Sequence, residues 1–152
     1  MIDTIPEPFL ILVLVLLSAA MGSFLNVVIY RVPVSGSIFT PASHCPKCKK
    51  KIKLLDNIPI LSYINLRGRC RHCQKQISWR YPLVELQAVI LTLLIYRIYG
   101  QSSAFLLFTG LAYLLIAITF IDIDHFIIPN GFIVLGLVVL VPTQALGWLP
   151  MH

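Results

Sequence analysis

The sequence predicts an all-α polytopic membrane protein with about four transmembrane helices and a zinc-ribbon-like loop between the first and the second. Three observations lead to this fold class. Of the 152 residues, 58% are apolar and 12% are charged, a composition too apolar for a water-soluble domain. The apolar residues fall into four long runs. Nearly all the positive charge lies in one loop, so the net charge of +6 does not describe the whole surface.

Residues 1–30 are expected to form a short external N-terminus and the first transmembrane helix. The apolar run over 9–30 can cross about 30 Å of hydrocarbon at roughly 1.5 Å per residue. A signal peptide is excluded because no basic segment precedes the run and because the run continues well past its small residues. Gly22 and its small neighbours predict the close approach of another helix. The amide of Asn26 is expected to hydrogen-bond to that helix, with contact to a substrate as the alternative.

Residues 31–81 form a basic loop that contains all four cysteines of the chain. The pairs Cys45-Pro46-Lys47-Cys48 and Cys70-Arg71-His72-Cys73 are separated by twenty-one residues. Each C-x-x-C turn lets two sulfurs converge on one ion, and two turns complete a tetrahedral shell. The spacing therefore predicts one structural Zn²⁺, with no position left open for water, bound by Cys45, Cys48, Cys70 and Cys73. Gly68 permits a tight approach to the second pair.

The tetracysteine loop has two other interpretations. Two disulfides would need an oxidising compartment, whereas the charge pattern places the loop in the cytoplasm. A basic zinc ribbon can also bind nucleic acid. Membrane segments on both sides supply another reason for the charge, so no nucleic-acid partner is expected.

Residues 82–152 contain the other three expected spans, at about 82–99, 104–121 and 131–149. Ser78 is predicted to cap the second helix, and Pro82 suits its first turn. Glu85 would then lie near the helix N-terminus, where the helix dipole favours an anion. A direct role for Glu85 is the alternative. A polar turn at 100–103 separates the second span from the third.

The distribution of charge predicts the orientation in the membrane. The loop is short enough for the positive-inside rule to apply, and it carries eleven cations against a single acid, Asp56. We therefore expect the loop in the cytoplasm, the N-terminus and residues 100–103 outside, and residues 122–130 back at the cytoplasmic face. In the reducing cytosol the cysteines stay available for metal.

The segment 120–130 holds the only cluster of ionisable groups near a span outside the basic loop. Asp122 and Asp124 are two residues apart, so on a helix they point in different directions and do not form a carboxylate pair. From the residues alone, two interpretations stay open. The aspartates are either solvated groups at a helix end or part of a catalytic site.

Several segments resemble the bacterial prepilin peptidases. They occur in the family's order over almost the whole chain: GSFLNVVIYRVP at 22–33, NIP at 57–59, SY at 62–63, LRGRC at 66–70, ISWRYPLVE at 77–85, and FID to IPN at 120–130. This resemblance implies a multi-pass aspartic endopeptidase of the bacterial inner membrane. Such enzymes cut the leader of type IV pilins and type II secretion pseudopilins after a glycine. They also methylate the new N-terminus with S-adenosylmethionine.

The same resemblance aligns Asp122 with the first catalytic aspartate of the family. The second lies in a Gly-x-Gly-Asp motif, and none of the eight glycines here precedes an aspartate. The sequence thus resembles the front half of the enzyme: a truncated product, a fragment, or one part of a split protein with a separate C-terminal half. An inactive or methyltransferase-only remnant and a non-enzymatic zinc-ribbon membrane adaptor are the alternatives.

Overall fold

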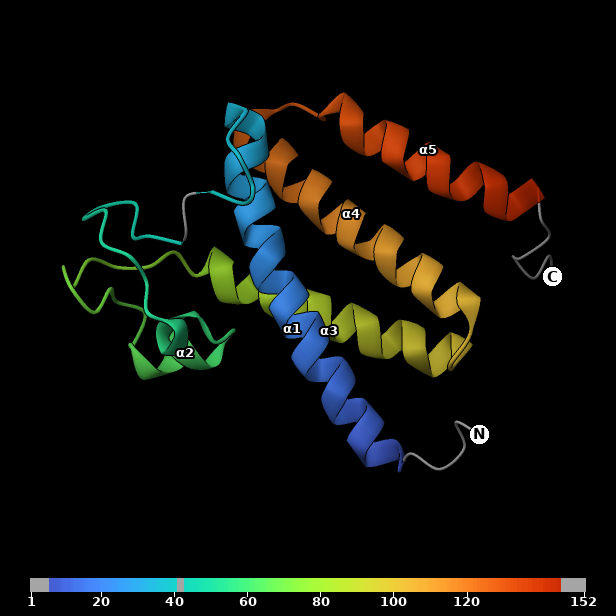
Figure 1. The fold of residues 1–152 in the computed structure, drawn as a ribbon, viewed down its shortest axis with the longest axis horizontal. Coiled ribbons are helices and arrows are strands. Elements are labelled where there is room, and N and C mark those ends of the chain that lie inside the picture. Colours follow the sequence, from blue (N-terminus) through green and yellow to red (C-terminus); the bar gives the residue numbers. More distant parts are fainter. Residues whose placement is uncertain (1–5, 41–42, 146–152) are drawn as a thin grey trace.

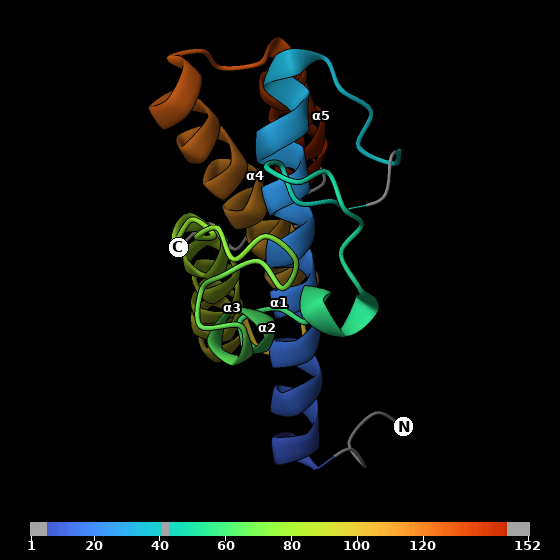
Figure 2. The ribbon, with the colours of Figure 1, turned by 90° about the vertical axis from the view of Figure 1, so that its left-hand side faces the viewer.

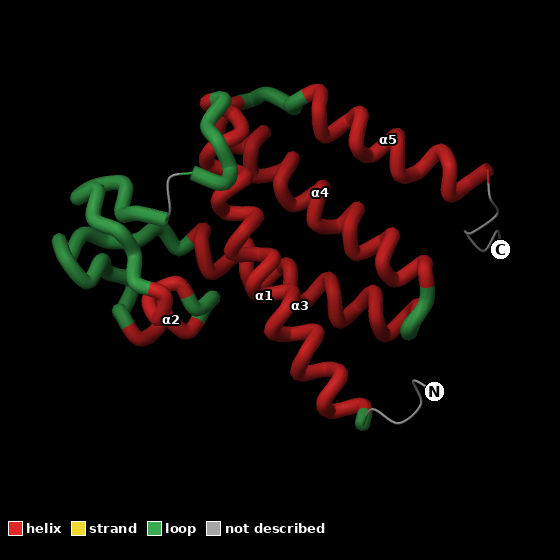
Figure 3. The backbone as a smooth tube through the Cα atoms, viewed as in Figure 1, coloured by secondary structure: helices red, strands yellow, loops and turns green. Residues whose placement is uncertain are grey.

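The computed structural model describes residues 6–40 and 43–145. These ranges contain long helices joined by loops and short helical turns, and no β-strand (Figure 3). The long helices are α1 (Glu7–Arg31), α3 (Arg80–Tyr99), α4 (Ser103–His125) and α5 (Asn130–Ala145). The short elements are the 3₁₀ turns η1 (Val32–Val34) and η2 (Leu54–Asn57) and the helix α2 (Leu61–Asn65).

The long helices confirm the all-α polytopic fold class. By length and composition, α1, α3 and α4 can each cross a membrane. Their outward faces carry large apolar side chains that are mostly exposed, among them Leu16 (62%), Leu106 (71%) and Leu115 (62%). Such a surface is what a helix presents to lipid. The fourth predicted span, 131–149, begins in α5, but its last residues lie outside the described part of the chain.

Helices α1, α3 and α4 pack on one another, and α5 lies along α4 (Figures 1 and 2). Their apolar contact faces form the core: Leu25, Val28, Ile29, Val84, Ala88, Ile116, Ala117, Phe120 and Ile121. The core belongs to the C-terminal halves of α1 and α4 and to the N-terminal half of α3. The helices are therefore fixed most firmly at the end from which the cysteine loop emerges (Figure 1).

The crossing of α1 and α3 depends on Gly22, as its small size predicts. A Cβ at this position would lie 2.6 Å from the Cα of Glu85 and 3.2 Å from the Cβ of Ala88. Because the nearest atom belongs to backbone, no side-chain rotation could relieve the contact. Any larger residue at Gly22 would push the two helices apart.

The predicted cap of the second long helix is wrong, and the third long helix continues past the span predicted for it. Helix α3 begins at Arg80 and has no side-chain cap, although the Ser78 hydroxyl accepts a hydrogen bond from the Arg80 amide at 3.3 Å. Helix α4 continues to His125, past the predicted span at about 104–121. There Phe126 adopts a left-handed conformation (φ 53°), and its amide donates to the Asp122 carbonyl at 2.8 Å. Asp122 and Asp124 therefore lie within the last turn of α4.

Candidate functional site

The first cysteine pair forms a compact backbone turn. The Cys45 amide donates to the Lys50 carbonyl at 2.9 Å, and the Lys49 amide donates back to the Cys45 carbonyl at 2.9 Å. Lys49 follows the second cysteine of the pair and has a left-handed backbone (φ 59°). This reversal brings Cys48 round so that it can face the same point as Cys45.

The second pair repeats this geometry. The Cys70 amide donates to the Lys75 carbonyl at 2.9 Å, and the Gln74 amide donates to the Cys70 carbonyl at 3.0 Å. Gln74, the residue after Cys73, again has a left-handed backbone (φ 56°). Gly68 enters this turn at φ +67°, and a Cβ there would lie 3.1 Å from the Tyr63 ring. The predicted need for a glycine before the second pair is confirmed.

The two turns bring the four sulfurs together, as the sequence predicts. All four Sγ atoms lie within 4.8 Å of one another, and the sulfurs of Cys45 and Cys73 are 3.9 Å apart. Zinc–sulfur bonds of about 2.3 Å in a tetrahedron place the sulfurs roughly 3.8 Å apart. A disulfide would need about 2.05 Å, and the four thiols are free. The cluster fits a four-thiolate Zn²⁺ site.

Local electrostatics prepare one of these ligands for metal. Burial raises the pKa of the Cys45 thiol, but hydrogen bonds from the backbone amides of Cys48 and Lys47 and from neighbouring thiols outweigh it and lower that pKa to about 6. The Lys75 amide lowers the pKa of Cys73, yet burial and the other three cysteines outweigh it and raise that pKa to about 11. The amides of the Cys45 turn therefore favour its thiolate, the form that binds metal.

An ion pair fastens the second turn to the rest of the loop. The Arg71 guanidinium donates through Nε and Nη2 to the two carboxylate oxygens of Asp56, at 2.8 and 2.6 Å. Asp56 is largely shielded, with a side chain 9% exposed. The hydrogen bonds from Arg71 hold the pKa of the Asp56 carboxyl below its usual range. The loop's single acid therefore orients the cysteine pair that contains Arg71.

Glu85 anchors the loop to the membrane helices, so the prediction that it serves the helix dipole is wrong. Because α3 begins at Arg80, Glu85 lies beyond the first turn, where the dipole effect has faded. Its side chain is buried between helices, and Oε2 accepts a hydrogen bond from the Ile60 amide at 2.7 Å. Ile60 has φ 61° and ψ −53°. The Leu61 amide donates a hydrogen bond to the Pro59 carbonyl at 2.6 Å. Glu85 thus holds a strained γ-turn in place.

Asn26 makes the helix-to-helix contact that the sequence predicts. Its Nδ2 donates to the Tyr81 carbonyl of α3 at 3.1 Å and to the Gly22 carbonyl of its own helix at 3.3 Å. The acceptor lies in the first turn of α3. The bond fixes where α3 starts relative to α1.

The two aspartates of α4 have different surroundings. Asp124 forms an ion pair with Arg80 Nη1 of α3. Arg80 Nη2 also donates to the Phe120 carbonyl at 2.9 Å, and its guanidinium lies 5.0 Å from the centre of the Phe120 ring. Asp122 is exposed. The geometry agrees with the prediction that the two carboxylates do not form one pair.

The contacts of Arg80 predict a measurable contribution to stability. Arg80→Met should lower the free energy of unfolding by about 1–3 kcal/mol, because it removes an ion pair, a carbonyl hydrogen bond and a cation–ring contact. Arg97→Met is the matched control in the same helix, at an exposed position, and should change stability by less than about 0.5 kcal/mol. Denaturant unfolding in detergent micelles measures both. Equal effects of the two variants would contradict the role of Arg80.

Sequence reasoning missed Arg80 and Ile60 as parts of this arrangement. In the sequence Arg80 is one of the loop's eleven positive charges, and its partner Asp124 is 44 residues away. The one available signal was its place at the boundary of an apolar run, where an arginine can reach the end of a neighbouring helix. Ile60 gave no signal, since its contribution is a backbone amide.

Comparison with known proteins agrees with the motifs. Residues 16–99 match the family described as "Bacterial Peptidase A24 N-terminal domain". A "Prepilin leader peptidase/N-methyltransferase" of Myxococcus xanthus is 43% identical over 130 residues, which cover 86% of this chain and 39% of that protein. A protein of the same name from Pseudomonas putida is 33% identical, covering 95% of this chain and 59% of the relative.

A "Type 4 prepilin-like proteins leader peptide-processing enzyme" of Escherichia coli is 42% identical, covering 73% of this chain and 48% of the relative. The chain thus spans about half the length of the curated relatives it matches. No solved structure matches it significantly. The matched range of the family includes the C-terminal half of α1, both cysteine pairs and all of α3. The chain belongs to the family of the bacterial peptidase A24 N-terminal domain.

Proposed function

We propose that this chain carries the N-terminal part of a prepilin leader peptidase and N-methyltransferase of the bacterial inner membrane. The observation that carries the proposal is the match of the cysteine loop and α3 to the family model. The last turn of α4 adds an exposed aspartate, Asp122. The substrates are prepilins or pseudopilins, whose apolar segments lie in the same lipid. In this proposal the cysteine loop faces the cytoplasm, where its positive charge is retained.

Asp122 acts as one of two catalytic carboxylates. Two carboxylates that share one proton hold one acid and one base at neutral pH, because both cannot ionise at close range. The base takes a proton from water, the resulting hydroxide attacks the scissile carbonyl carbon, and the acid donates its proton to the carbonyl oxygen. Collapse of this intermediate breaks the C–N bond, and the leaving amine takes up a proton.

The second carboxylate comes from a segment with a Gly-x-Gly-Asp motif, which the printed sequence does not contain. Asp124 is a poor substitute because Arg80 already neutralises it. Glu85 is buried and its Oε2 accepts the Ile60 amide. The exposure of Asp122 leaves its carboxylate accessible to a partner segment.

The cysteine cluster gives the loop its shape and takes no part in the peptide-bond chemistry. Four protein ligands fill the coordination shell of Zn²⁺, so no site is left for a metal-bound water. S-adenosylmethionine, which the names of the relatives imply, would supply the methyl group for the second activity.

Prepilin cleavage assays test the proposal. The chain should not cut prepilin by itself, and it should cut when co-expressed with a segment that bears a Gly-x-Gly-Asp helix. Asp122→Asn should lower the rate of this cleavage by at least about a thousandfold, because one half of the proton-sharing pair is lost. Asp124→Asn is the matched control. It should retain cleavage, since its carboxylate serves an ion pair.

Other outcomes would overturn parts of the proposal. Robust cleavage by the chain alone would refute the requirement for a second segment. It would point to Asp124, or to Asp122 of a second copy, as the other acid. No cleavage with the added segment, but intact zinc binding, would favour an inactive remnant or a membrane adaptor. Retained cleavage in Asp122→Asn would remove Asp122 from the site.

A further inference from the structure

The C-terminal end of α4 receives little support from packing. Ile121 is fully buried in the core, but residues 122–128 are all exposed. The ends of helices fray because their last carbonyl groups lack helical partners. Within the described part of the chain, the Asp122 side chain has no hydrogen bond or ion pair. The position of its carboxylate therefore depends on whatever holds the backbone of this last turn.

Arg80, at the start of α3, contacts this turn from the side. Its Nη1 forms the ion pair with Asp124, and its Nη2 donates to the Phe120 carbonyl at 2.9 Å. The guanidinium also lies 5.0 Å from the centre of the Phe120 ring. An isolated exposed ion pair contributes little, but here three contacts share one planar group. Arg80 thus holds the turn both before and after residue 122.

Asp122 lies on the opposite side of the helix from the two residues that Arg80 contacts. With 3.6 residues per turn, position 122 is rotated by about 200° from position 120 and by about 160° from position 124. Positions 120 and 124 share one face, because they are one turn apart. Arg80 therefore acts on the direction of the Asp122 carboxylate through the backbone of the turn.

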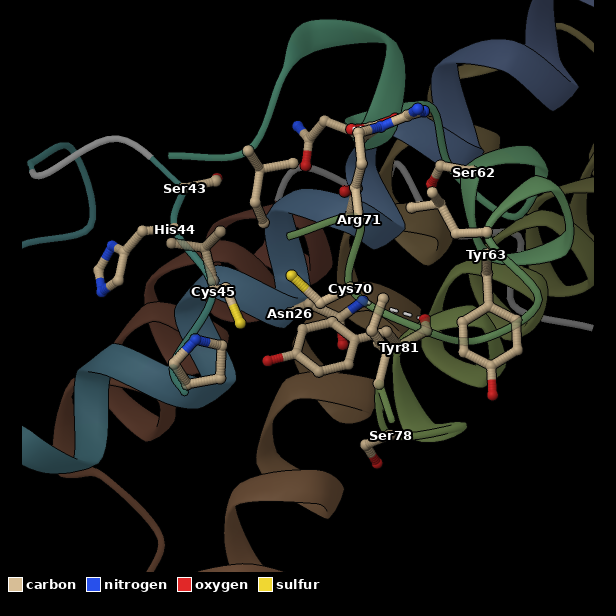
Figure 4. Close-up of a pocket in the computed structure, with 18 of the residues that line it drawn as sticks. Asn26, Ser43, His44, Cys45, Ser62, Tyr63, Cys70, Arg71, Ser78 and Tyr81 are labelled. Carbon is tan, nitrogen blue, oxygen red and sulfur yellow. Dashed lines mark hydrogen bonds and ion pairs between the residues drawn. The ribbon is translucent and has the colours of Figure 1, made fainter. Parts of the chain in front are cut away.

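The start of α3, which carries Arg80, is itself fixed. The Asn26 amide donates to the Tyr81 carbonyl at 3.1 Å and ties this end of α3 to α1. Ser78 and Tyr81 line a cavity of about 640 Å³ between the cysteine loop and the helices (Figure 4), whereas neither Arg80 nor Asp122 lines it. A change of the Arg80 side chain therefore leaves the lining of this cavity in place and acts on α4.

We propose that Arg80 is a positioning residue for Asp122, and the proposal rests on the peptidase function proposed above. By holding positions 120 and 124, Arg80 keeps position 122 helical and directs the Asp122 carboxylate toward the attacking water and the second carboxylate. Misplacement of a catalytic group by about 1 Å can lower a rate by about a hundredfold. Loss of Arg80 should therefore slow the chemical step more than it weakens substrate binding.

Steady-state kinetics of prepilin cleavage, with the co-expressed Gly-x-Gly-Asp segment, test the proposal. Arg80→Met should lower kcat by at least about tenfold and change KM by less than about twofold. Arg80→Lys should recover part of the loss in kcat, because it keeps the positive charge but not the planar fork. Asp124→Leu should also lower kcat. Asp124→Asn should lower it less, since it keeps an oxygen that can accept from Arg80.

Thr92→Val is the matched control for lost stability. It removes the 2.7 Å hydrogen bond between the hydroxyls of Thr92 and Tyr113, which joins α3 to α4 about two and a half turns before Asp122. Thr92→Val should lower the melting temperature, as Arg80→Met does, and leave kcat unchanged. Hydrogen exchange of residues 122–126 should be faster in Arg80→Met alone. Equal losses of kcat in the two variants would assign the effect to stability and overturn the proposal.

The remaining outcomes separate this inference from the proposed function. No cleavage by the unmodified chain with its segment would overturn the peptidase proposal and, with it, any catalytic role of Arg80. If the unmodified chain cuts and Arg80→Met cuts equally fast, this inference fails and the peptidase proposal stands. A raised KM with unchanged kcat in Arg80→Met would place Arg80 in substrate binding and would also overturn its positioning role.

Discussion

Cys70→Ser should release zinc from the chain and unfold the loop between α1 and α3, while the helices stay folded. A serine hydroxyl is a poor ligand, and the other three sulfurs cannot complete a tetrahedral shell. The free energy of metal binding, of order 10 kcal/mol for structural zinc sites, contributes directly to folding of such a loop. Metal analysis should show about one zinc ion per unmodified chain and nearly none in the variant.

The Cys70→Ser experiment has a matched control variant and a second measurement. His72→Ser changes an exposed residue between two ligands of the same turn and should keep the zinc. Limited proteolysis should cut the loop of Cys70→Ser and spare the loop of His72→Ser. A Cys70→Ser chain that keeps one zinc ion and a protected loop would refute the four-thiolate site.

The sequence was informative where structure depends on local geometry. Two residues between the cysteines of each pair are enough to predict that both turns face one ion, and the sulfurs do gather. Gly22 predicted a close helix crossing because only its small size matters there. In each case the deciding property is carried by the residue itself or by its near neighbours in the chain.

Prediction failed where the partner is distant in sequence or belongs to the backbone. Glu85 looked like a dipole-stabilising acid, because nothing marks the Ile60 amide, 25 residues earlier, as its partner. The apolar run before Asp122 indicates where the span ends, but it does not indicate where the helix ends. The helix in fact continues until Phe126 turns left-handed. The ion pair of Asp124 with Arg80 also supports this last turn.

Gly22→Ala should destabilise the chain, whereas the same substitution at Gly110 should not. In a helix, alanine is normally favoured over glycine by about 0.5–1 kcal/mol. Gly110, in α4, has nothing within 4 Å of an added Cβ, so Gly110→Ala should leave stability unchanged or slightly raised. At Gly22 the added methyl meets the Glu85 backbone at 2.6 Å. Overpacking of this kind costs about 1–3 kcal/mol.

The effect of Gly22→Ala should extend from the helix crossing to the attachment of the loop. The atom that must move is the Cα of Glu85, and the same residue holds the Ile60 amide. Separation of α1 from α3 therefore loosens the bond that ties the loop to the helices. We expect limited proteolysis to cut the loop faster in Gly22→Ala than in Gly110→Ala, at equal zinc content. Denaturant unfolding and limited proteolysis of both variants measure this. If Gly22→Ala proved as stable as Gly110→Ala, α1 and α3 would not cross as closely as the structure places them.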